Sequence, residues 1–173
     1  MSMDSLQTLF EKELKDLYNA EKQLVTALPR IAKAATSAQL RDAITSHLRE
    51  TEGHVTRLER ILRSLDLPAR GKKCKGMEGL IEEGKEILGE DGEGEVIDAA
   101  LISAAQRVEH YEIAAYGCLI SYAETLGHDD AAGLLKQTLS EEEAADEKLT
   151  QLAEGGINQA AAAVGGGSEE EDE

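Results

Sequence analysis

The fold of this chain is decided by the stretch QRVEHYEIAAY, residues 106–116. Read at 3.6 residues per turn, its apolar side chains fall on one face of a helix, and Glu112 lies near the middle of that face. Glu109, one turn earlier, leans toward the same side. An isolated buried carboxylate is so costly that it is normally neutralised, paired or bound to a metal. The stretch therefore predicts a helix that carries two carboxylates into an interior where other helices must supply partners.

The composition favours helices over sheets. The chain has 173 residues, of which 41% are hydrophobic but only 3% are aromatic, with no Trp and a single Phe. A core built from Leu, Ile, Val and Ala suits helices. The length corresponds to one domain with a substantial core.

The charge of the chain excludes several classes of partner. It carries 35 acidic and 18 basic residues, a net charge of −17, which disfavours binding to nucleic acid or to anionic membranes. The first residues lack the basic and apolar pattern of a signal peptide, and no apolar run is long enough to span a bilayer. We therefore expect a soluble cytoplasmic protein.

Apolar stripes at helical spacing predict four long helices. Pro29 is expected to kink or break the first, with one or two more turns after it, because it removes a backbone hydrogen bond and clashes with the preceding turn. Thr36-Ser37 and Asp129 are expected to cap the second and fourth, and Gly127 to end the third. The predicted ranges are about 4–35, 38–65, 95–126 and 129–154.

Short connections join the first two helices and the last two, so each pair is expected to form an antiparallel hairpin. A long crossover between the pairs contains a stretch with helical spacing, residues 77–88, which predicts a short accessory helix. The predicted fold is thus an all-α four-helix bundle over residues 1–154. Residues 155–173, rich in Ala and Gly and then acidic, are expected to form a disordered tail.

Each long helix carries ionisable residues at mid-height of its apolar face, and the two hairpins nearly repeat each other in the spacing of these residues. Glu141, Glu143 and Glu147 are expected mostly in solvent, although Glu143 and also His47 are reserve candidates. Carboxylates with an imidazole suit iron or manganese, and bridging glutamates can hold two ions. The candidate metal ligands are Glu21, Glu50, His54, Glu109, Glu112, Glu142 and Asp146.

Five segments of the chain are distinctive: AEKQL (20–24), ETEGHV (50–55), KKCKGMEGL (72–80), VEHYE (108–112) and EEEAAD (141–146). With them the sequence resembles the YciF/YciE-type family of stress-associated proteins, within the di-iron carboxylate ferritin-like superfamily. The resemblance covers nearly the whole chain to about residue 154.

This resemblance implies a ferritin-like bundle with an accessory helix, forming a homodimer. It also implies a centre of two iron ions, with manganese or zinc as alternatives, and oxidase-like or peroxidase-like chemistry in a stress response. The chain departs from the wider superfamily at two positions. Gly53 stands three residues after Glu50 where histidine is usual, and Asp146 stands in place of the histidine of the last helix.

A second hypothesis requires no metal. The protein would then be a non-catalytic acidic helical dimer with a structural or interaction role. Its buried acids would be protonated or paired with Arg107 and Lys22, because buried charge networks can serve conformational specificity alone.

Overall fold

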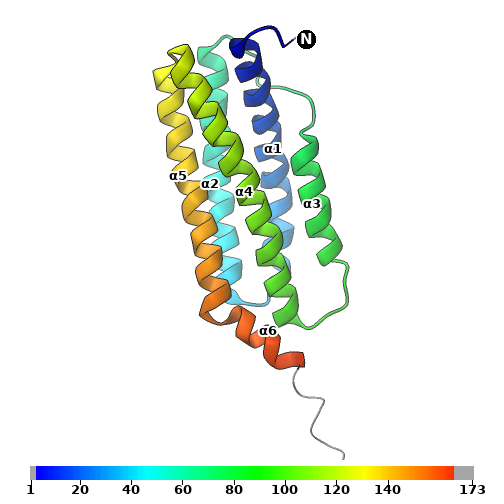
Figure 1. Cartoon of the computed structure of the whole chain (residues 1–173). Helices are drawn as coiled ribbons and strands as arrows, with labels where there is room; N and C mark the ends of the chain where they lie inside the picture. The colour runs from blue at the N-terminus through cyan, green and yellow to red at the C-terminus, as the bar shows by residue number, and fades with distance from the viewer. Residues whose placement is uncertain (1–2, 166–173) are drawn as a thin grey trace, which may run out of the picture.

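The computed structural model describes residues 3–165, and in this part of the chain all regular structure is helical (Figure 1). None of these helices is both long enough and apolar enough to cross a membrane. The elements are α1 (Leu6–Ala34), α2 (Ala38–Ser64), α3 (Lys75–Ile87), α4 (Gly94–Leu126), α5 (Asp129–Leu152), a π-helical turn η1 (Ala153–Ile157) and α6 (Asn158–Gly165).

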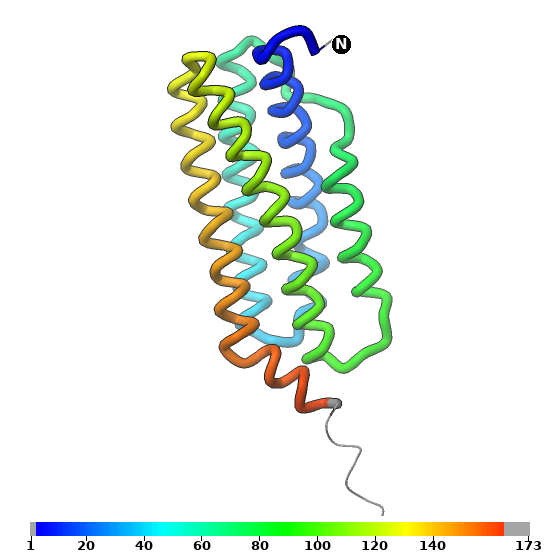
Figure 2. Tube along the Cα trace, viewed as in Figure 1, coloured from blue at the N-terminus to red at the C-terminus, as the bar shows by residue number. Residues whose placement is uncertain are grey.

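Four long helices form an antiparallel bundle, as the sequence predicted. The α1–α2 hairpin packs against the α4–α5 hairpin, and the crossover brings the chain back along the bundle so that α2 and α4 run in the same direction (Figure 2). The accessory helix α3 lies on the crossover and packs against α1 and α4 (Figure 1). This is the predicted architecture of two hairpins and one long connection.

The helix ends follow from local chemistry. Ser5 and Ser37 are the N-cap residues of α1 and α2, and their hydroxyls accept hydrogen bonds from Thr8 N and Leu40 N. Gly127 ends α4 in the left-handed region, with φ 76°. Asp129 does not cap α5 as predicted but is its first residue, where a carboxylate still interacts favourably with the positive end of the helix.

Pro29 does not break α1, one of the two outcomes expected there, and the helix continues beyond it to Ala34. The helix is continuous from Leu6 to Ala34 with Pro29 inside it. The proline is exposed and lies in the last two turns. Only a few residues of α1 follow the lost hydrogen bond, and these are held by packing of Ala32 and Ala35 in the core.

The chain also stays helical beyond the predicted bundle boundary. Sequence reasoning assigned residues 155–173 to a disordered tail, but residues 155–165 continue through η1 into α6, which packs against α4. Gly156, with φ 149°, provides the bend that lets α6 turn back onto the bundle. Residues 166–173 lie outside the described part of the chain.

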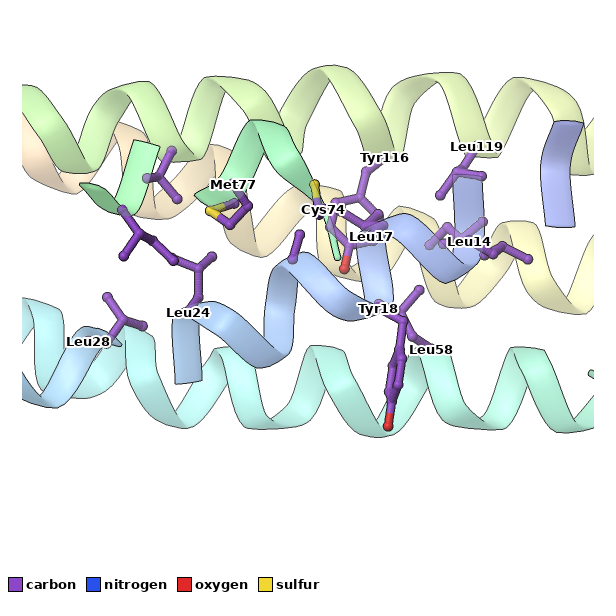
Figure 3. Packing of buried hydrophobic residues seen from close by; sticks show 14 of the residues in the cluster. Leu14, Leu17, Tyr18, Leu24, Leu28, Leu58, Cys74, Met77, Tyr116 and Leu119 are labelled. Atoms are coloured by element: carbon purple, nitrogen blue, oxygen red, sulfur yellow. The ribbon is translucent and has the colours of Figure 1, made fainter. Parts of the chain in front are cut away.

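Buried Leu, Ile and Ala side chains from α1, α2, α4 and α5 fill the bundle, and Met77 and Ile81 extend this core under α3 (Figure 3). Polar contacts fix the start of α3: Asn19 Oδ1 accepts a hydrogen bond from Cys74 N (2.7 Å), and Gln23 Nε2 donates to Cys74 O (3.0 Å). The accessory helix is therefore anchored to α1, at the height of the bundle centre.

Candidate metal centre

The inward stripe of α2 advances in alternating steps of three and four residues, the spacing of a helix that faces a core. Its buried members include Ile44, His47, Thr51, His54 and Leu58. Two imidazoles thus enter the interior near mid-height of the bundle.

The other long helices contribute carboxylates on the same principle. Glu21 continues the buried stripe of α1, Glu109 and Glu112 lie on the inward face of α4, and Glu142 lies on that of α5. The exposed fraction is 0% for Glu21, Glu112 and Glu142 and 2% for Glu109. Four carboxylates that would each be unstable alone are therefore enclosed together.

One group of potential ligands consists of His47, Glu109, Glu112 and Glu142, and one ligand atom of each lies within 4.8 Å of all the others. His47 Nε2 is 3.2 Å from Glu109 Oε1 and 3.7 Å from Glu142 Oε2. The group draws on three helices, α2, α4 and α5.

A second group consists of Glu21, His54 and Glu142. His54 Nδ1 is 2.9 Å from Glu142 Oε1 and 3.5 Å from Glu21 Oε1. Glu142 therefore belongs to both groups, with one oxygen toward His47 and the other toward His54. A carboxylate in this position can bridge two metal ions.

These six residues leave polar atoms without hydrogen bonds in the interior. Within residues 3–165, every buried side-chain nitrogen or oxygen that lacks a hydrogen-bond partner belongs to one of them, and both oxygens of Glu112 and of Glu142 are among these atoms. Even the 2.9 Å contact between His54 Nδ1 and Glu142 Oε1 lacks hydrogen-bond geometry. Since most buried polar groups are satisfied, this concentration needs a specific explanation.

An outer network orients His54. Glu141 Oε2 lies 2.9 Å from His54 Nε2, and Arg57 donates to both oxygens of Glu141 at 2.7 and 2.8 Å. Arg57 Nη1 also donates to Thr138 Oγ1 at 3.1 Å. With Nε2 held from outside, Nδ1 points at Glu21 and Glu142, which is how an outer carboxylate fixes a metal-ligating imidazole.

Glu50 has the corresponding place beside His47. Its Oε2 lies 3.5 Å from His47 Nδ1, on the side of the ring away from Glu109 and Glu142. The Glu50 side chain is 44% exposed, so it lies at the edge of the interior. Sequence reasoning placed Glu50 among the ligands, whereas the structure brings His47 into the ligand group and leaves Glu50 as its outer neighbour.

Asp146 is the other predicted ligand that joins neither group. Its carboxylate accepts a hydrogen bond from Gln106 Nε2 (3.2 Å) and lies 3.2 Å from His110 Nε2. Asp146 follows Glu142 by four residues on α5, but its side chain is 22% exposed and contacts residues of α4, whereas Glu142 is fully buried. The other five predicted ligands, Glu21, His54, Glu109, Glu112 and Glu142, are all in the two groups.

The surroundings shift the protonation of this cluster strongly. Burial and then the charges of Glu21 and Glu142 raise the pKa of Glu112 well above its usual range. Burial, reinforced by Glu21 and Glu109 and opposed by His54, raises the pKa of Glu142 to about 8. Burial opposes the charged form of His54, but Glu142 and Glu21 outweigh it and raise its pKa to about 10. The metal-free cluster therefore holds protons in place of other cations.

Tyr116 of α4 contacts the cluster through Glu21 of α1. It is fully buried, and its hydroxyl donates a hydrogen bond to Glu21 Oε1. Burial and the nearby charges of Glu21 and Glu112 raise the pKa of Tyr116 well above its usual range. It is therefore a neutral phenol that can hold one oxygen of Glu21 in position.

The donor set fits a transition metal. Four carboxylates and two imidazoles suit iron, manganese or zinc, which accept both oxygen and nitrogen ligands. Two groups joined by a shared glutamate match the general plan of bundle carboxylate sites, in which facing helices supply glutamates and histidines to a pair of ions. Because the four carboxylates are buried, they could also stabilise a cation in a site with little access to water.

The sequence matches a described protein family and is similar to a protein of Escherichia coli. The family described as a domain of unknown function, DUF892, matches residues 5–162. Protein YciF of Escherichia coli (strain K12) is 48% identical over 160 residues, which cover 92% of this chain and 96% of YciF.

Solved structures agree with that comparison. The crystal structure of the E. coli stress protein YciF has a TM-score of 0.87, covering 90% of this chain and 99% of that one. YcfI of Rhodopseudomonas palustris, whose description suggests a structural role, is 42% identical with a TM-score of 0.84, covering 86% and 95% of the two chains. A Xanthomonas campestris protein, 22% identical with a TM-score of 0.76, shares the fold. With its match over residues 5–162, its identity to YciF and its helical bundle, the chain belongs to the ferritin-like YciF/YciE-type family.

Proposed function

We propose that this protein binds two metal ions in the centre of its bundle, with iron as the first candidate and manganese or zinc as alternatives. His47, Glu109, Glu112 and Glu142 would hold one ion, and Glu21, His54 and Glu142 the other. Two predicted ligands are not included. Glu50 lies beside His47 and can act on the ions only through it, and Asp146 contacts Gln106 outside both groups.

The observation that carries this proposal is the set of unsatisfied buried atoms. Glu112 presents two buried oxygens that have no hydrogen-bond partner and belong to a group with His47, Glu109 and Glu142. Cations would neutralise this group and satisfy its lone pairs together.

Two iron ions in such a site would supply one-electron redox chemistry toward oxygen or peroxide. The surrounding residues have defined tasks. Arg57 and Glu141 orient His54, Tyr116 holds Glu21, and the apolar stripes above and below the centre exclude bulk water. We place this oxidase-like or peroxidase-like function in the stress response named for the E. coli relative, in a cytoplasmic homodimer.

Elemental analysis tests the metal centre directly. The protein is purified without added metal and its bound metal per chain is measured, together with that of Glu112→Ala and Glu143→Ala. Glu143 is the matched control, because it is a glutamate directly after the buried Glu142 on α5 but is exposed. We expect bound metal in the parent and in Glu143→Ala and its loss in Glu112→Ala. Near-zero metal in all three, also after incubation with Fe(II) or Mn(II), would refute the proposal.

The competing function is a non-catalytic acidic dimer. The raised pKa values of Glu112 and His54 favour it, because protonated acids and imidazolium–carboxylate contacts could balance the interior without metal. The predicted pairing with Arg107 and Lys22 has no support: Arg107 lies 3.5 Å from Glu83, and Lys22 lies over the ring of Tyr18. Thermal melting separates the two functions, since only a metal protein gains stability from Mn(II) by mass action.

A further inference from the structure

An apolar cavity of about 230 Å³ lies inside the bundle beside the candidate metal centre. Its walls come from all four long helices and from α3. The buried side chains of Leu24, Leu28, Ile44 and Leu101 form its deep part, and His47 and Glu109 of the first ligand group form one end. A dry engineered cavity of about 150 Å³ is enough to bind benzene, so this space exceeds that of a single small ring.

Small residues create this volume. Gly84 of α3 is buried in the cavity wall, and a Cβ added there would meet no other atom within 4 Å. Ala104 and Ala105 of α4 also line the cavity. Glycine inside a helix and unfilled volume in a core both lower stability. Larger side chains at these positions would fill the cavity and favour the helix, and both effects would stabilise the protein. The chain therefore keeps this cavity at the expense of stability.

The polar residues that line the cavity restrict what it can hold. Besides His47 and Glu109 they are Ser46, Glu50 and Lys148, all three exposed, from α2 and α5. The entrance therefore lies between α2 and α5, and its two charges are of opposite sign. No lysine or arginine other than Lys148 lines the described cavity, and its walls are mainly apolar side chains, so a charged group inside it would be buried without a partner.

We infer that this cavity binds an uncharged, mainly hydrocarbon molecule, larger than benzene, with one end against His47 and Glu109. A protein segment is a poorer fit, because the deep walls are buried side chains of five helices. As a binding site this inference stands alone. As the substrate class of a metal enzyme it rests on the proposed function.

The test uses the full chain, freed of metal by a chelator, and titrates it calorimetrically with 1-octanol and with octanoate, which share a chain length but differ in charge. We expect saturable binding of 1-octanol and at least tenfold weaker binding of octanoate. Gly84→Leu should weaken 1-octanol binding at least tenfold by filling the cavity. The matched control is Gly79→Leu, at an exposed position of the same helix that also has free space around an added Cβ.

Ala105→Leu repeats the test from α4, so the result does not depend on Gly84→Leu folding. Absence of saturable 1-octanol binding, or binding unchanged in both cavity variants, would overturn the inference. A third outcome would also overturn it: the parent protein does not bind 1-octanol, and the two cavity variants lose a dimer that the parent forms. The cavity would then be part of an interface between copies of the chain.

Nearness to the metal is measured separately. In protein loaded with Mn(II), paramagnetic relaxation of the 1-octanol protons should be strong and should disappear in Gly84→Leu. Binding to metal-free protein together with a failure to retain Mn(II) would leave the cavity assignment standing and refute only the metal centre. Binding to Mn(II)-loaded protein without relaxation would refute the placement of the ligand against His47 and Glu109.

Discussion

Glu142 is the residue at which the two halves of the candidate metal centre meet, since one of its oxygens faces His47 and the other His54. Replacing it by Gln keeps the shape and removes one buried negative charge. We expect Glu142→Gln to lose at least half of the bound metal, because an amide bridges two cations poorly. In metal-free protein at pH 8 the same change should raise Tm by roughly 2–4 °C, corresponding to about 1 kcal/mol for a chain of this size.

These two opposite effects are measured by elemental analysis and by thermal melting in chelator. Glu143→Gln is the control and should change neither quantity, because its side chain is exposed. Retention of full metal together with a lower Tm in chelator would contradict a bridging role and would make Glu142 a structural residue.

Arg57 acts on the centre through two other residues, Glu141 and His54. Arg57→Ala removes the guanidinium group that holds both oxygens of Glu141, so Glu141 can move and the His54 ring can rotate. We expect metal affinity to fall by about 10–100-fold, the usual effect of losing an outer partner of a ligand. Competition with a chromogenic chelator measures the change. Arg60→Ala, at an exposed arginine of the same helix, should retain the parent affinity, and equal affinities in all three proteins would rule out the orienting role.

The candidate ligands are easiest to predict from the sequence where a charged residue falls within an apolar stripe. Glu21 and Glu112 satisfy that condition, Glu142 falls at the edge of its stripe, and all three are fully buried. The spacing of four residues favours the pair Glu50 and His54, so from the sequence His47 is only a reserve candidate. Continuing the stripe of α2 from Ile44 in alternating steps of three and four leads through His47 and His54 and leaves Glu50 at the edge. The pairing of Glu141 with Arg57 could not be predicted, because it joins two helices far apart in the sequence.

The accessory helix α3 packs closely against α4 at one point, where the backbone of Gly76 meets the ring of Tyr111. A Cβ at Gly76 would lie 2.6 Å from the Tyr111 ring, whose hydroxyl is 3.1 Å from Cys74 Sγ. Tyr111 cannot move without breaking that contact, so Gly76→Ala should push α3 outward. We expect a loss of about 1–3 kcal/mol of unfolding free energy, the usual cost of overpacking.

Denaturant unfolding measures this loss, and Gly79→Ala is the control. Gly79 is exposed on the same helix with free space around an added Cβ, so the change there should stabilise by about 0.5–1 kcal/mol. Equal effects of both substitutions would show that helix propensity, and not the fit against Tyr111, decides the outcome.

The positions of the long helices could be predicted because apolar residues recur at helical spacing along each of them, on both sides of the ionisable residues at mid-height. The helix continues past Pro29, and residues 155–165 are helical where a disordered tail was predicted, for one shared reason. Proline and glycine weaken a helix locally, but packing holds α1 together past Pro29 and holds α6 against α4. The run QAAAAV in α6 has high helix propensity, but without a charged or apolar pattern nothing in the sequence pointed to the surface that it covers.

For the whole molecule, the buried cluster sets how stability depends on pH when no metal is bound. Glu112 and Glu142 have raised pKa values, the latter about 8, against about 4.3 in an unfolded chain, and that of His54 is about 10 against about 6.5. The folded state then binds more protons than the unfolded state. Its stability is fully present below the unfolded values and is lost as pH rises through the folded ones, by about 1 kcal/mol per pH unit for each such group.

Melting in chelator between pH 5 and pH 9 measures this slope, and we expect Tm to fall steadily over that range. Glu112→Gln should flatten the curve, because it removes a group that must stay protonated in the folded state. Glu143→Gln should leave the slope unchanged and so reports on the exposed acids that give the chain its net charge of −17. A slope that is the same in Glu112→Gln and the parent would assign it to surface repulsion instead.

Bound metal should reverse this dependence, because cations take the place of the protons in the cluster. Metal affinity must then rise with pH as Glu142 and His54 give up protons on binding. We expect the Tm difference between Mn(II)-loaded and chelated protein to widen from pH 6 to pH 8, and proton release to be detectable in weakly buffered solution. The widening should become smaller in Glu142→Gln, where His54 still releases a proton, and should persist in full in Glu143→Gln. A Tm difference that is constant across this range would mean that Mn(II) binds to exposed carboxylates, which are already ionised, and not to the interior of the bundle.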